Sequence, residues 1–169
     1  MLNICLFEPE IPQNTGNIAR TCASTGTRLC LVHPLGFDIS EKAVRHAGLD
    51  YWKYVDIEEY SSVDAFMEKH CGDELFFFST KGRRVYSDVH YPMDRDVYLI
   101  FGKESRGIDE RILKANPERT LRLPMIGDIR SLNLSNSAAI ACYEYYRQSG
   151  WKGFRTQGEL HESRWEDAL

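Results

Sequence analysis

Two short segments of the chain are strongly apolar, and they constrain the fold more than any other feature. They are residues 75–79 (LFFFS) and 97–101 (VYLIF). A strand with one face in water alternates apolar and polar residues, whereas a strand covered by helices on both faces is a nearly continuous apolar run. The two segments therefore predict buried parallel strands.

The rest of the chain alternates between strand-like and helix-like patterns. Further strands are expected at residues 3–7, 28–32, 51–55 and 120–123, and helices at residues 17–24, 40–47, 62–70, 109–115 and 135–149. This alternation predicts an α/β fold with a mainly parallel sheet flanked by helices.

Length and composition favour one globular domain. The chain has 169 residues, of which 43% are hydrophobic and 27% charged, as in ordinary soluble proteins. We expect residues 1–150 to form a single domain and residues 151–169 to be a C-terminal tail. The tail is polar and aromatic, has no clear period and indicates no role.

Neither a membrane segment nor a disulfide is expected. No apolar run has the length of a membrane helix, and residues 1–8 lack the basic segment and long apolar stretch of a signal peptide. The five cysteines are scattered and form no CxxC pair, which favours reduced thiols in a cytoplasmic protein over disulfides or a zinc site. No acidic or histidine cluster supports a catalytic metal, so we expect none.

The net charge of −4 argues against a protein that coats nucleic acid through general basicity. Phosphate binding depends on the local electrostatic potential rather than on net charge, however, and cations can cluster on one face of an acidic protein. Basic side chains fall near the motifs described below: Arg20, Arg45, His46, Lys81, Arg83, Arg84, Lys103, Arg106 and Arg130.

Segments rich in glycine and polar residues follow four of the expected strands, after Phe7, Ser79, Phe101 and Leu123. In parallel sheets, ligands bind beyond the carboxyl ends of the strands, so these segments predict one shared site. A dinucleotide loop is excluded because the chain has no GxGxxG. Residues 102–107 (GKESRG) match neither a P-loop nor the Gly-x-Ser-x-Gly of a nucleophile elbow.

The first motif, residues 14–20 (NTGNIAR), stands at a helix entrance. Asn14 or Thr15 can serve as the helix cap, so a structural role alone accounts for either residue. A cap does not explain Arg20, which is expected about one turn inside the helix, where the helix dipole disfavours a cation. We therefore expect Arg20 to have an anionic partner, either a phosphate or Glu104.

The second motif, residues 99–108 (LIFGKESRGI), leads from an apolar strand into a glycine loop with a carboxylate between cations. An ordinary strand-to-helix turn with surface charges explains it equally well. The third motif, residues 122–127 and 130–139, is more specific, because it holds more short polar side chains at a helix entrance than one cap requires. These are Ser131, Asn133, Ser135, Asn136 and Ser137.

In this order, the three motifs resemble those of the SPOUT superfamily of methyltransferases, and most closely its small TrmH-like branch, the YibK/TrmL-type tRNA methyltransferases. The resemblance extends from Met1 to about Gly150. It implies a C-terminal deep trefoil knot, S-adenosylmethionine as methyl donor, and a homodimer that pairs its first and last helices. The small residues in 137–142 fit that interface, although packing of the helix on its own sheet explains them too.

Carried over position by position, the resemblance implies two groups of site residues. In the cofactor pocket, apolar side chains would flank adenine, and Gly102 would let the backbone approach it. The cofactor-binding positions are Phe78, Thr80, Gly102, Leu123, Ile126, Ser131 and Leu132. The catalytic positions are Asn14, Arg20, Glu104, Ser131 and Asn133.

The implied reaction transfers a methyl group to a ribose 2′-hydroxyl. The oxygen, the methyl carbon and the sulfur must be in line, and charge on the oxygen must be stabilised. Arg20 would grip the neighbouring phosphate and stabilise the incipient alkoxide, because a guanidinium stays protonated and is a poor base. Asn14 would orient Arg20 or the ribose, and Glu104 would pair with Arg20 or lie near the sulfonium. Ser131 and Asn133 would hold the methionine part and the substrate hydroxyl.

The branch also implies the substrate, which is the wobble nucleotide (position 34, cytidine or modified uridine) of leucine tRNAs. The sequence shows no appended RNA-binding domain, so the dimer surface itself would bind RNA, without an obligatory protein partner. Candidate contacts are Arg45, His46, Lys81, Arg83, Arg84, Lys103 and Arg106. Three alternatives stay open: a ribosomal-RNA 2′-O-methyltransferase, a non-catalytic RNA-binding protein that retains the fold, and a base methyltransferase of the same superfamily.

Overall fold

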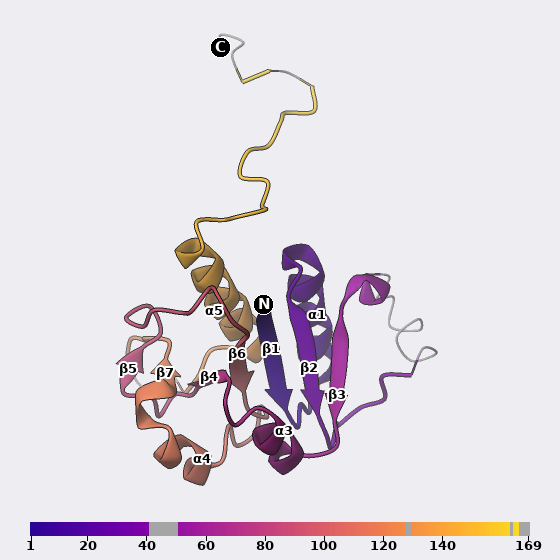
Figure 1. Ribbon diagram of the computed structural model, residues 1–169. Helices are drawn as coiled ribbons and strands as arrows, with labels where there is room; N and C mark the ends of the chain where they lie inside the picture. Colours follow the sequence, from indigo (N-terminus) through magenta and orange to yellow (C-terminus); the bar gives the residue numbers. More distant parts are fainter. Residues whose placement is uncertain (41–50, 128–129, 163, 166–169) are drawn as a thin grey trace.

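A seven-stranded sheet forms the centre of the molecule (Figure 1). The computed structural model describes residues 1–40, 51–127, 130–162 and 164–165. The strand order is β3-β2-β1-β6-β4-β7-β5, and every neighbouring pair is parallel, as the sequence predicts. The strands are β1 (Leu2–Phe7), β2 (Arg28–Val32), β3 (Ile57–Tyr60), β4 (Glu74–Phe78), β5 (Arg84–Val85), β6 (Val97–Phe101) and β7 (Thr120–Arg122).

Helices cover both faces of the sheet. They are α1 (Pro12–Thr25), α3 (Val63–Lys69), α4 (Glu110–Ala115) and α5 (Leu134–Gln148), with short 3-10 helices η1 (Trp52–Tyr54) and η2 (Pro117–Arg119).

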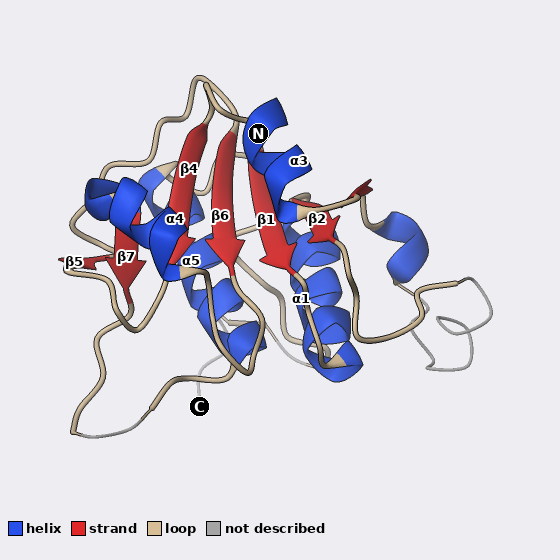
Figure 2. Cartoon of the chain, turned by 90° about the horizontal axis from the view of Figure 1, so that it is seen from below, coloured by secondary structure: helices blue, strands red, loops and turns tan. Residues whose placement is uncertain are grey.

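The two faces carry separate apolar clusters, because successive residues of a strand point to opposite sides. Ile4 of β1 packs with Ile18 of α1 and Ala138 of α5. Phe7 of the same strand packs with Phe66 of α3 and Leu113 of α4. Figure 2 shows α1 and α5 on one side of the sheet and α3 on the other. With both faces covered, every residue of β6 is buried, which explains its apolar sequence.

The strand expected at residues 51–55 is wrong. That segment contains η1, and the strand is β3, directly after it. The sequence of β3 (IEEY) is too polar to be recognised as a strand of a buried sheet. Its Glu58 is accommodated by ion pairs with Lys69 at 2.6 Å and with Arg28 at 3.3 Å. The helix expected at 40–47 falls almost wholly outside the described residues, and the two-residue strand β5 was not predicted.

Helix α1 begins earlier than its sequence predicts. Its first residue is Pro12, which suits a first turn because that position needs no backbone N–H. Asn14 and Thr15 therefore lie inside the first turn, and neither is the cap. Arg20 is the ninth of the 14 residues of α1, so the argument that the helix dipole demands an anionic partner for it is wrong.

The small residues of α5 pack inside their own chain. Ala138, Ala141 and Cys142 have no exposed surface and belong to the core cluster under the sheet. Of the two explanations open from the sequence, helix-to-sheet packing is therefore the one that the structure supports for these three. The outer face of α5 still carries exposed apolar side chains, Ile140 and Tyr143.

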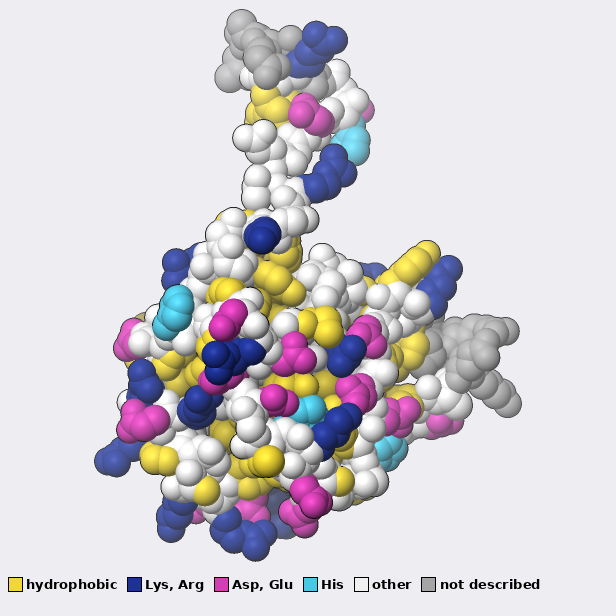
Figure 3. Space-filling view, in the orientation of Figure 1, with side chains coloured by type: hydrophobic (Ala, Val, Ile, Leu, Met, Phe, Trp, Pro, Cys, Tyr) yellow, Lys and Arg dark blue, Asp and Glu magenta, His cyan; other side chains and the backbone are white. Residues whose placement is uncertain are grey.

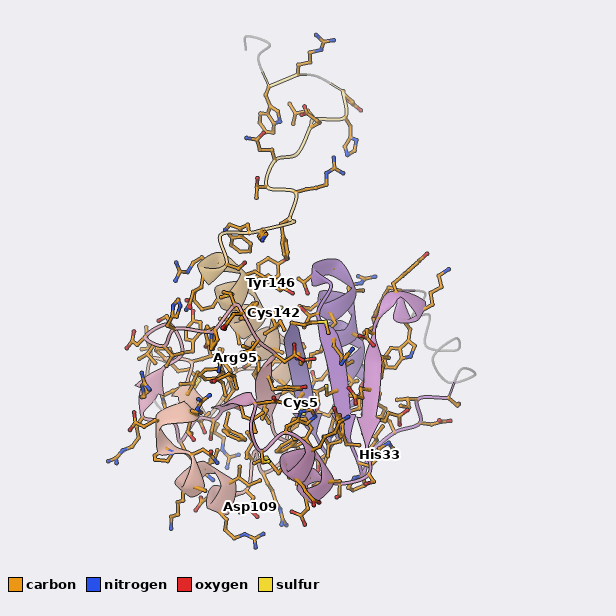
Figure 4. All side chains as sticks on the ribbon, in the orientation of Figure 1. Cys5, His33, Arg95, Asp109, Cys142 and Tyr146 are labelled. Atoms are coloured by element: carbon orange, nitrogen blue, oxygen red, sulfur yellow. The ribbon has the colours of Figure 1, made fainter. Side chains whose placement is uncertain are left out.

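The five cysteines are free. Figure 4 shows Cys5 within the sheet and Cys142 on α5. Burial raises the pKa of the Cys30 thiol to about 12 and that of Cys5 well above its usual value. Thiols held in this protonated state are weak nucleophiles, so these two side chains serve packing.

Beyond α5 the chain leaves the body of the protein (Figure 1). Trp151 and Phe154 still pack on α5, through ring contacts with Tyr143 (5.8 Å between centroids) and Tyr146 (4.6 Å). The described residues from 155 onward form no helix or strand and are exposed. None of the helices described is long and apolar enough to cross a membrane.

Candidate active site

A pocket of about 400 Å³ opens beyond the carboxyl ends of β4, β6 and β7. Figure 2 shows the arrowheads of these strands at one edge of the sheet. The volume is that of a small-molecule site, and the edge is where parallel sheets bind ligands. The four loops expected to converge there on sequence grounds include the three that follow these strands.

Nine of the residues expected at the site line this pocket. They are Asn14, Phe78, Thr80, Gly102, Glu104, Leu123, Ser131, Leu132 and Asn133. The other two, Arg20 and Ile126, are not among the described residues that line it, and Ile126 is 92% exposed. Phe101 was missed, although its position as the last strand residue before Gly102 was a usable signal; its ring stacks on Phe78, with 4.8 Å between centroids.

Two glycines let the pocket loops cross closely. A Cβ on Gly82 would lie 2.6 Å from the carbonyl carbon of Leu121. A Cβ on Gly102 would lie 2.8 Å from the carbonyl oxygen of Gly107, and closer still to the backbone nitrogen of Ile108. Real Cβ atoms essentially never come this near to other backbone. Glycine is therefore a steric requirement at both positions.

The second motif forms a tight hairpin, which we call the 102–107 hairpin. Lys103 and Gly107 form an antiparallel bridge, and the N–H of Gly107 donates to the carbonyl of Lys103 at 2.8 Å. Gly107 has a φ of 71°, the left-handed conformation that glycine adopts most easily. The Lys103 ammonium pairs with the carboxylate of Glu8.

Glu104 binds the start of α1. Its carboxylate accepts hydrogen bonds from the backbone N–H groups of Glu10 (2.9 Å) and Ile11 (3.3 Å) and from the side-chain amide of Asn14 (2.9 Å). The expected pair between Glu104 and Arg20 is absent among the described residues. The Glu104 carboxylate is occupied instead by the backbone just before Pro12 and by the Asn14 amide.

A chain of side-chain hydrogen bonds links the three motifs. The Glu104 carboxylate only accepts, so the NH₂ of Asn14 must face it, and the Asn14 oxygen then faces Asn133. Asn133 donates its NH₂ to that oxygen at 2.9 Å. The Asn133 oxygen in turn accepts from the N–H of Ser135 at 2.9 Å and from that of Asn136, which caps α5. Each amide orientation is thus determined by its neighbour.

This chain predicts that Asn133→Asp and Asn133→Ala have different effects. Alanine loses the N-cap and should cost about 1 kcal/mol of the free energy of unfolding. Aspartate is as good an N-cap as asparagine, so any loss of stability in that variant should come from the conflict with Asn14 alone. The carboxylate of the Asn133→Asp variant would present an acceptor to the Asn14 oxygen, and turning the Asn14 amide would only move the conflict to Glu104. We expect turnover to fall by about 10²-fold in both variants, because pocket geometry is lost. Urea unfolding and a methyl-transfer assay measure the two effects; an Asn133→Asp enzyme with normal turnover contradicts the coupling.

Arg20 lies outside the pocket and against an aromatic ring. It is exposed, and its guanidinium carbon lies 4.8 Å from the centroid of the Tyr51 ring. The Tyr51 hydroxyl donates to the carbonyl of Gly16 at 2.8 Å, one turn earlier in α1. Tyr51 therefore fixes the direction of the Arg20 side chain by a cation–π contact while being anchored to the same helix.

The other cations expected at the site are distributed unevenly. Arg106 and Arg130 line the pocket. Lys81 also lines it, but pairs with Glu110 at 2.7 Å, and Arg84 lies 3.4 Å from Glu118. Arg83 is exposed, and Arg45 and His46 fall outside the described residues. Figure 3 shows Lys and Arg side chains along the edge formed by β5 and α4, with acidic side chains among them.

The described residues contain no group of three or more His, Cys, Asp or Glu side chains placed to hold a metal ion. Of the ionisable side chains that line the pocket, Glu104 belongs to the hydrogen-bond network, and Glu10 lies just outside the lining. The pKa of Glu10 lies below its usual value, because its carboxylate accepts hydrogen bonds from the backbone N–H and the hydroxyl of Ser105.

Known proteins are similar to this chain in sequence and in fold. The model of the SpoU rRNA Methylase family matches residues 1–143. A tRNA (cytidine(34)-2′-O)-methyltransferase of Escherichia coli is 47% identical over 154 residues, which cover 90% of this chain and 97% of the relative. A solved structure described as giving insights into the 2-OH methylation of C/U34 on tRNA has a TM-score of 0.81 and 44% identity, and the match covers 89% of this chain and 97% of the other.

A more distant neighbour shares the fold. The SpoU methyltransferase AviRb of Streptomyces viridochromogenes, solved with AdoMet, has a TM-score of 0.73 at 22% identity, covering 88% of this chain and 58% of its own. The family match includes all three motifs, so the resemblance read from them is confirmed, together with the parallel α/β sheet and its C-terminal knot. The chain belongs to the SpoU methylase family and has the knotted α/β fold of the SPOUT methyltransferases.

Proposed function

We propose that this protein transfers a methyl group from S-adenosylmethionine to the ribose 2′-hydroxyl of the wobble nucleotide, position 34 (cytidine or modified uridine), of leucine tRNAs. The observation that carries this proposal is the meeting of three motif segments in one pocket, joined by the bonds from Glu104 through Asn14 to Asn133. Relatives over 40% identical along nearly their whole length bear the name of this tRNA activity, which supports the choice of tRNA over ribosomal RNA.

The pocket residues fit S-adenosylmethionine. Its adenine requires an apolar slot, and Phe78, Leu123 and Leu132 supply apolar surface. Its polar groups require donors and acceptors, which Thr80 and Ser131 can provide together with the backbone. The glycine at 102 is required by the crossing with Gly107 and Ile108, and that crossing shapes the hairpin that lines the pocket.

When bound, the cofactor supplies an electrophilic methyl group whose departure leaves a neutral thioether, so the chemistry requires no metal. The protein must hold the ribose hydroxyl in line with that methyl group and stabilise charge on its oxygen, while the hydroxyl proton passes to the neighbouring phosphate or to water. We assign the hydroxyl to Asn133 and Ser131 at the pocket wall, with Asn14 fixing the orientation of Asn133. Glu104 holds Asn14 and the start of α1 in place.

Arg20 fits the phosphate next to the target ribose better than the reacting hydroxyl itself. It stands six residues after Asn14 on α1, about 9 Å further along the helix axis, and does not line the pocket. A nucleotide in the pocket has a phosphate on either side of its ribose, within reach of a long side chain. We propose that Arg20, directed by Tyr51, grips one of these phosphates and stabilises the charge that develops on the ribose oxygen.

We also propose that the enzyme is a homodimer that uses the outer face of α5. Ile140 and Tyr143 are 39% and 47% exposed and stand three residues apart, on one side of the helix. Ile140→Asp should convert dimers to monomers, because dimerisation would then bury an unpaired charge. Tyr54→Asp is the control, since Tyr54 is more exposed but lies on η1. Sedimentation velocity measures both, and a monomeric wild-type protein contradicts the proposal.

Three further expectations belong to this proposal. Residues 1–150 form the catalytic domain, and residues 151–169 are an appendage to it. The enzyme works in the cytoplasm, where its tRNA substrate is found, without an obligatory protein partner. The RNA-binding surface combines the cations of the pocket mouth, Arg106 and Arg130, with a second subunit.

The direct test is methyl transfer from labelled S-adenosylmethionine to unmodified tRNA transcripts, followed by mapping of the modified nucleotide. The expected result is one 2′-O-methyl group at position 34 of leucine tRNAs. Incorporation into ribosomal RNA alone would select the ribosomal alternative. Failure of the wild-type protein to bind S-adenosylmethionine in calorimetry would favour a non-catalytic RNA-binding protein, and a methylated base would select the base methyltransferases.

A further inference from the structure

Two glutamates exchange hydrogen bonds between the segment that precedes α1 and the 102–107 hairpin. Glu104 of the hairpin accepts from the backbone N–H groups of Glu10 and Ile11. Glu10 accepts in return from the backbone N–H and the hydroxyl of Ser105, both at 2.9 Å. The first half of this exchange involves a residue of the motifs, but the second half depends on Glu10, which lies outside all three.

The bonds from Ser105 to Glu10 matter because of where Ser105 lies in the hairpin. The hairpin is closed at its base by the bridge between Lys103 and Gly107, and Ser105 is at its tip. Ser105 and both of its neighbours in the hairpin line the pocket. The bridge holds the two strands of the hairpin together, whereas the bonds from Ser105 to Glu10, beside those of Glu104, tie the tip to the segment before α1.

Glu10 is a fixed anchor for that tip. The carbonyl of Pro9, just before it, accepts from the N–H of Gly36 at 2.9 Å. A Cβ on Gly36 would lie 2.9 Å from the Cα of Glu10, so the two backbones are already in close contact. With its backbone held between Gly36 and Glu104, Glu10 can hold the hairpin tip without moving itself.

We propose that Glu10 is a positioning residue that holds the tip of the 102–107 hairpin against the cofactor pocket and thereby sets the affinity for S-adenosylmethionine. The inference rests on the proposed function, because it assigns the pocket to that cofactor. Glu10 acts through Ser105 and touches neither substrate.

The electrostatic setting supports this role. The bonds from Ser105 hold the pKa of Glu10 below its usual value, with smaller contributions from the charges of Lys103 and Arg106. Glu10 is therefore ionised at neutral pH and accepts both bonds as a carboxylate. Both residues are exposed, so loss of their contact leaves the apolar core and the bridge at the base of the hairpin intact.

The test compares Glu10→Ala, Glu10→Gln and Ser105→Ala in the full-length protein, with Glu68→Ala as the matched control. Glu68 is another exposed glutamate, but it lies on α3. Isothermal titration with S-adenosylmethionine should show the Kd raised about tenfold in Glu10→Ala, as for the loss of one to two hydrogen bonds. Glu10→Gln keeps an acceptor oxygen and Ser105→Ala keeps the backbone bond, so both should show smaller increases, and Glu68→Ala none.

Two further measurements separate positioning from general stability. Turnover at saturating cofactor should stay within about threefold of wild type in Glu10→Ala, and its thermal midpoint should match that of Glu68→Ala. In the double variant, Ser105→Ala should add little to Glu10→Ala, because both remove the same contact. An unchanged Kd in Glu10→Ala overturns the proposal, as does a raised Kd that comes with a thermal midpoint well below that of Glu68→Ala. If wild type itself does not bind the cofactor, the proposed function fails, and this inference with it.

Discussion

Replacing Arg20 by alanine should abolish methyl transfer to tRNA while leaving the affinity for S-adenosylmethionine nearly unchanged. Arg20 stands outside the pocket, so its loss removes nothing that the cofactor contacts. Removing one donor that stabilises transition-state charge typically lowers turnover by about 10²–10³-fold, and Arg20 would also supply the grip on the phosphate. Single-turnover methyl transfer and calorimetry measure the two halves of this prediction.

The control for this variant is Arg111→Ala. Arg111 is on α4, its side chain is 91% exposed, and its loss changes the net charge by the same amount. It should methylate tRNA at the wild-type rate. Arg20→Lys should recover only part of the activity, because an ammonium lacks the planar fork that grips a phosphate and stacks on Tyr51. Retained turnover in Arg20→Ala would remove Arg20 from the mechanism.

Gly102→Ala should lose cofactor binding and destabilise the fold together. The added methyl group would meet backbone atoms of Gly107 and Ile108, and backbone cannot turn aside as a flexible side chain can. Overpacking of this kind costs about 1–3 kcal/mol. If most of that strain is relieved by opening the 102–107 hairpin, affinity for S-adenosylmethionine should fall on the order of 10²-fold. Urea unfolding and calorimetry on the same preparation record both changes.

Gly72→Ala provides the matched comparison. A Cβ at Gly72 would meet no atom within 4 Å, and its φ is not in the left-handed region. Its unfolding free energy and cofactor affinity should therefore equal those of wild type or improve slightly, as expected when a compatible glycine is replaced. If Gly102→Ala behaves like Gly72→Ala, the crossing at residue 102 does not shape the pocket.

The parts of the fold that could be predicted are those determined by local composition. A strand buried on both faces must be apolar, so β4 and β6 were evident from the sequence. The helix entrance in the third motif could also be predicted, because its cap, Asn133, directly precedes the helix in the sequence. The convergence of loops at the site followed from the parallel sheet alone.

The parts that could not be predicted depend on residues far apart in the chain. Helix α1 begins at Pro12 without a side-chain cap, and the carboxylate that holds the segment before it, Glu104, is 94 residues from Glu10. The bond between Asn133 and Asn14 spans 119 residues. Glu10 belonged to no motif, and its role becomes visible only when Ser105 is beside it. Strand β3 was hidden because its Glu58 pairs with Arg28 and Lys69 and its Glu59 with His33, all outside the strand.

The composition of the pocket determines when, during synthesis of the chain, a ligand can first bind. Its lining begins at Ile11 and ends at Ser137, so most of the domain must be synthesised before the last wall exists. The ribosome makes the N-terminal part of the chain first. Until Asn133 is synthesised, Asn14 therefore lacks the hydrogen bond that Asn133 donates to it in the folded domain. A ligand stabilises only states that bind it. S-adenosylmethionine therefore cannot assist the chain while it emerges from the ribosome, and can stabilise only the nearly finished domain.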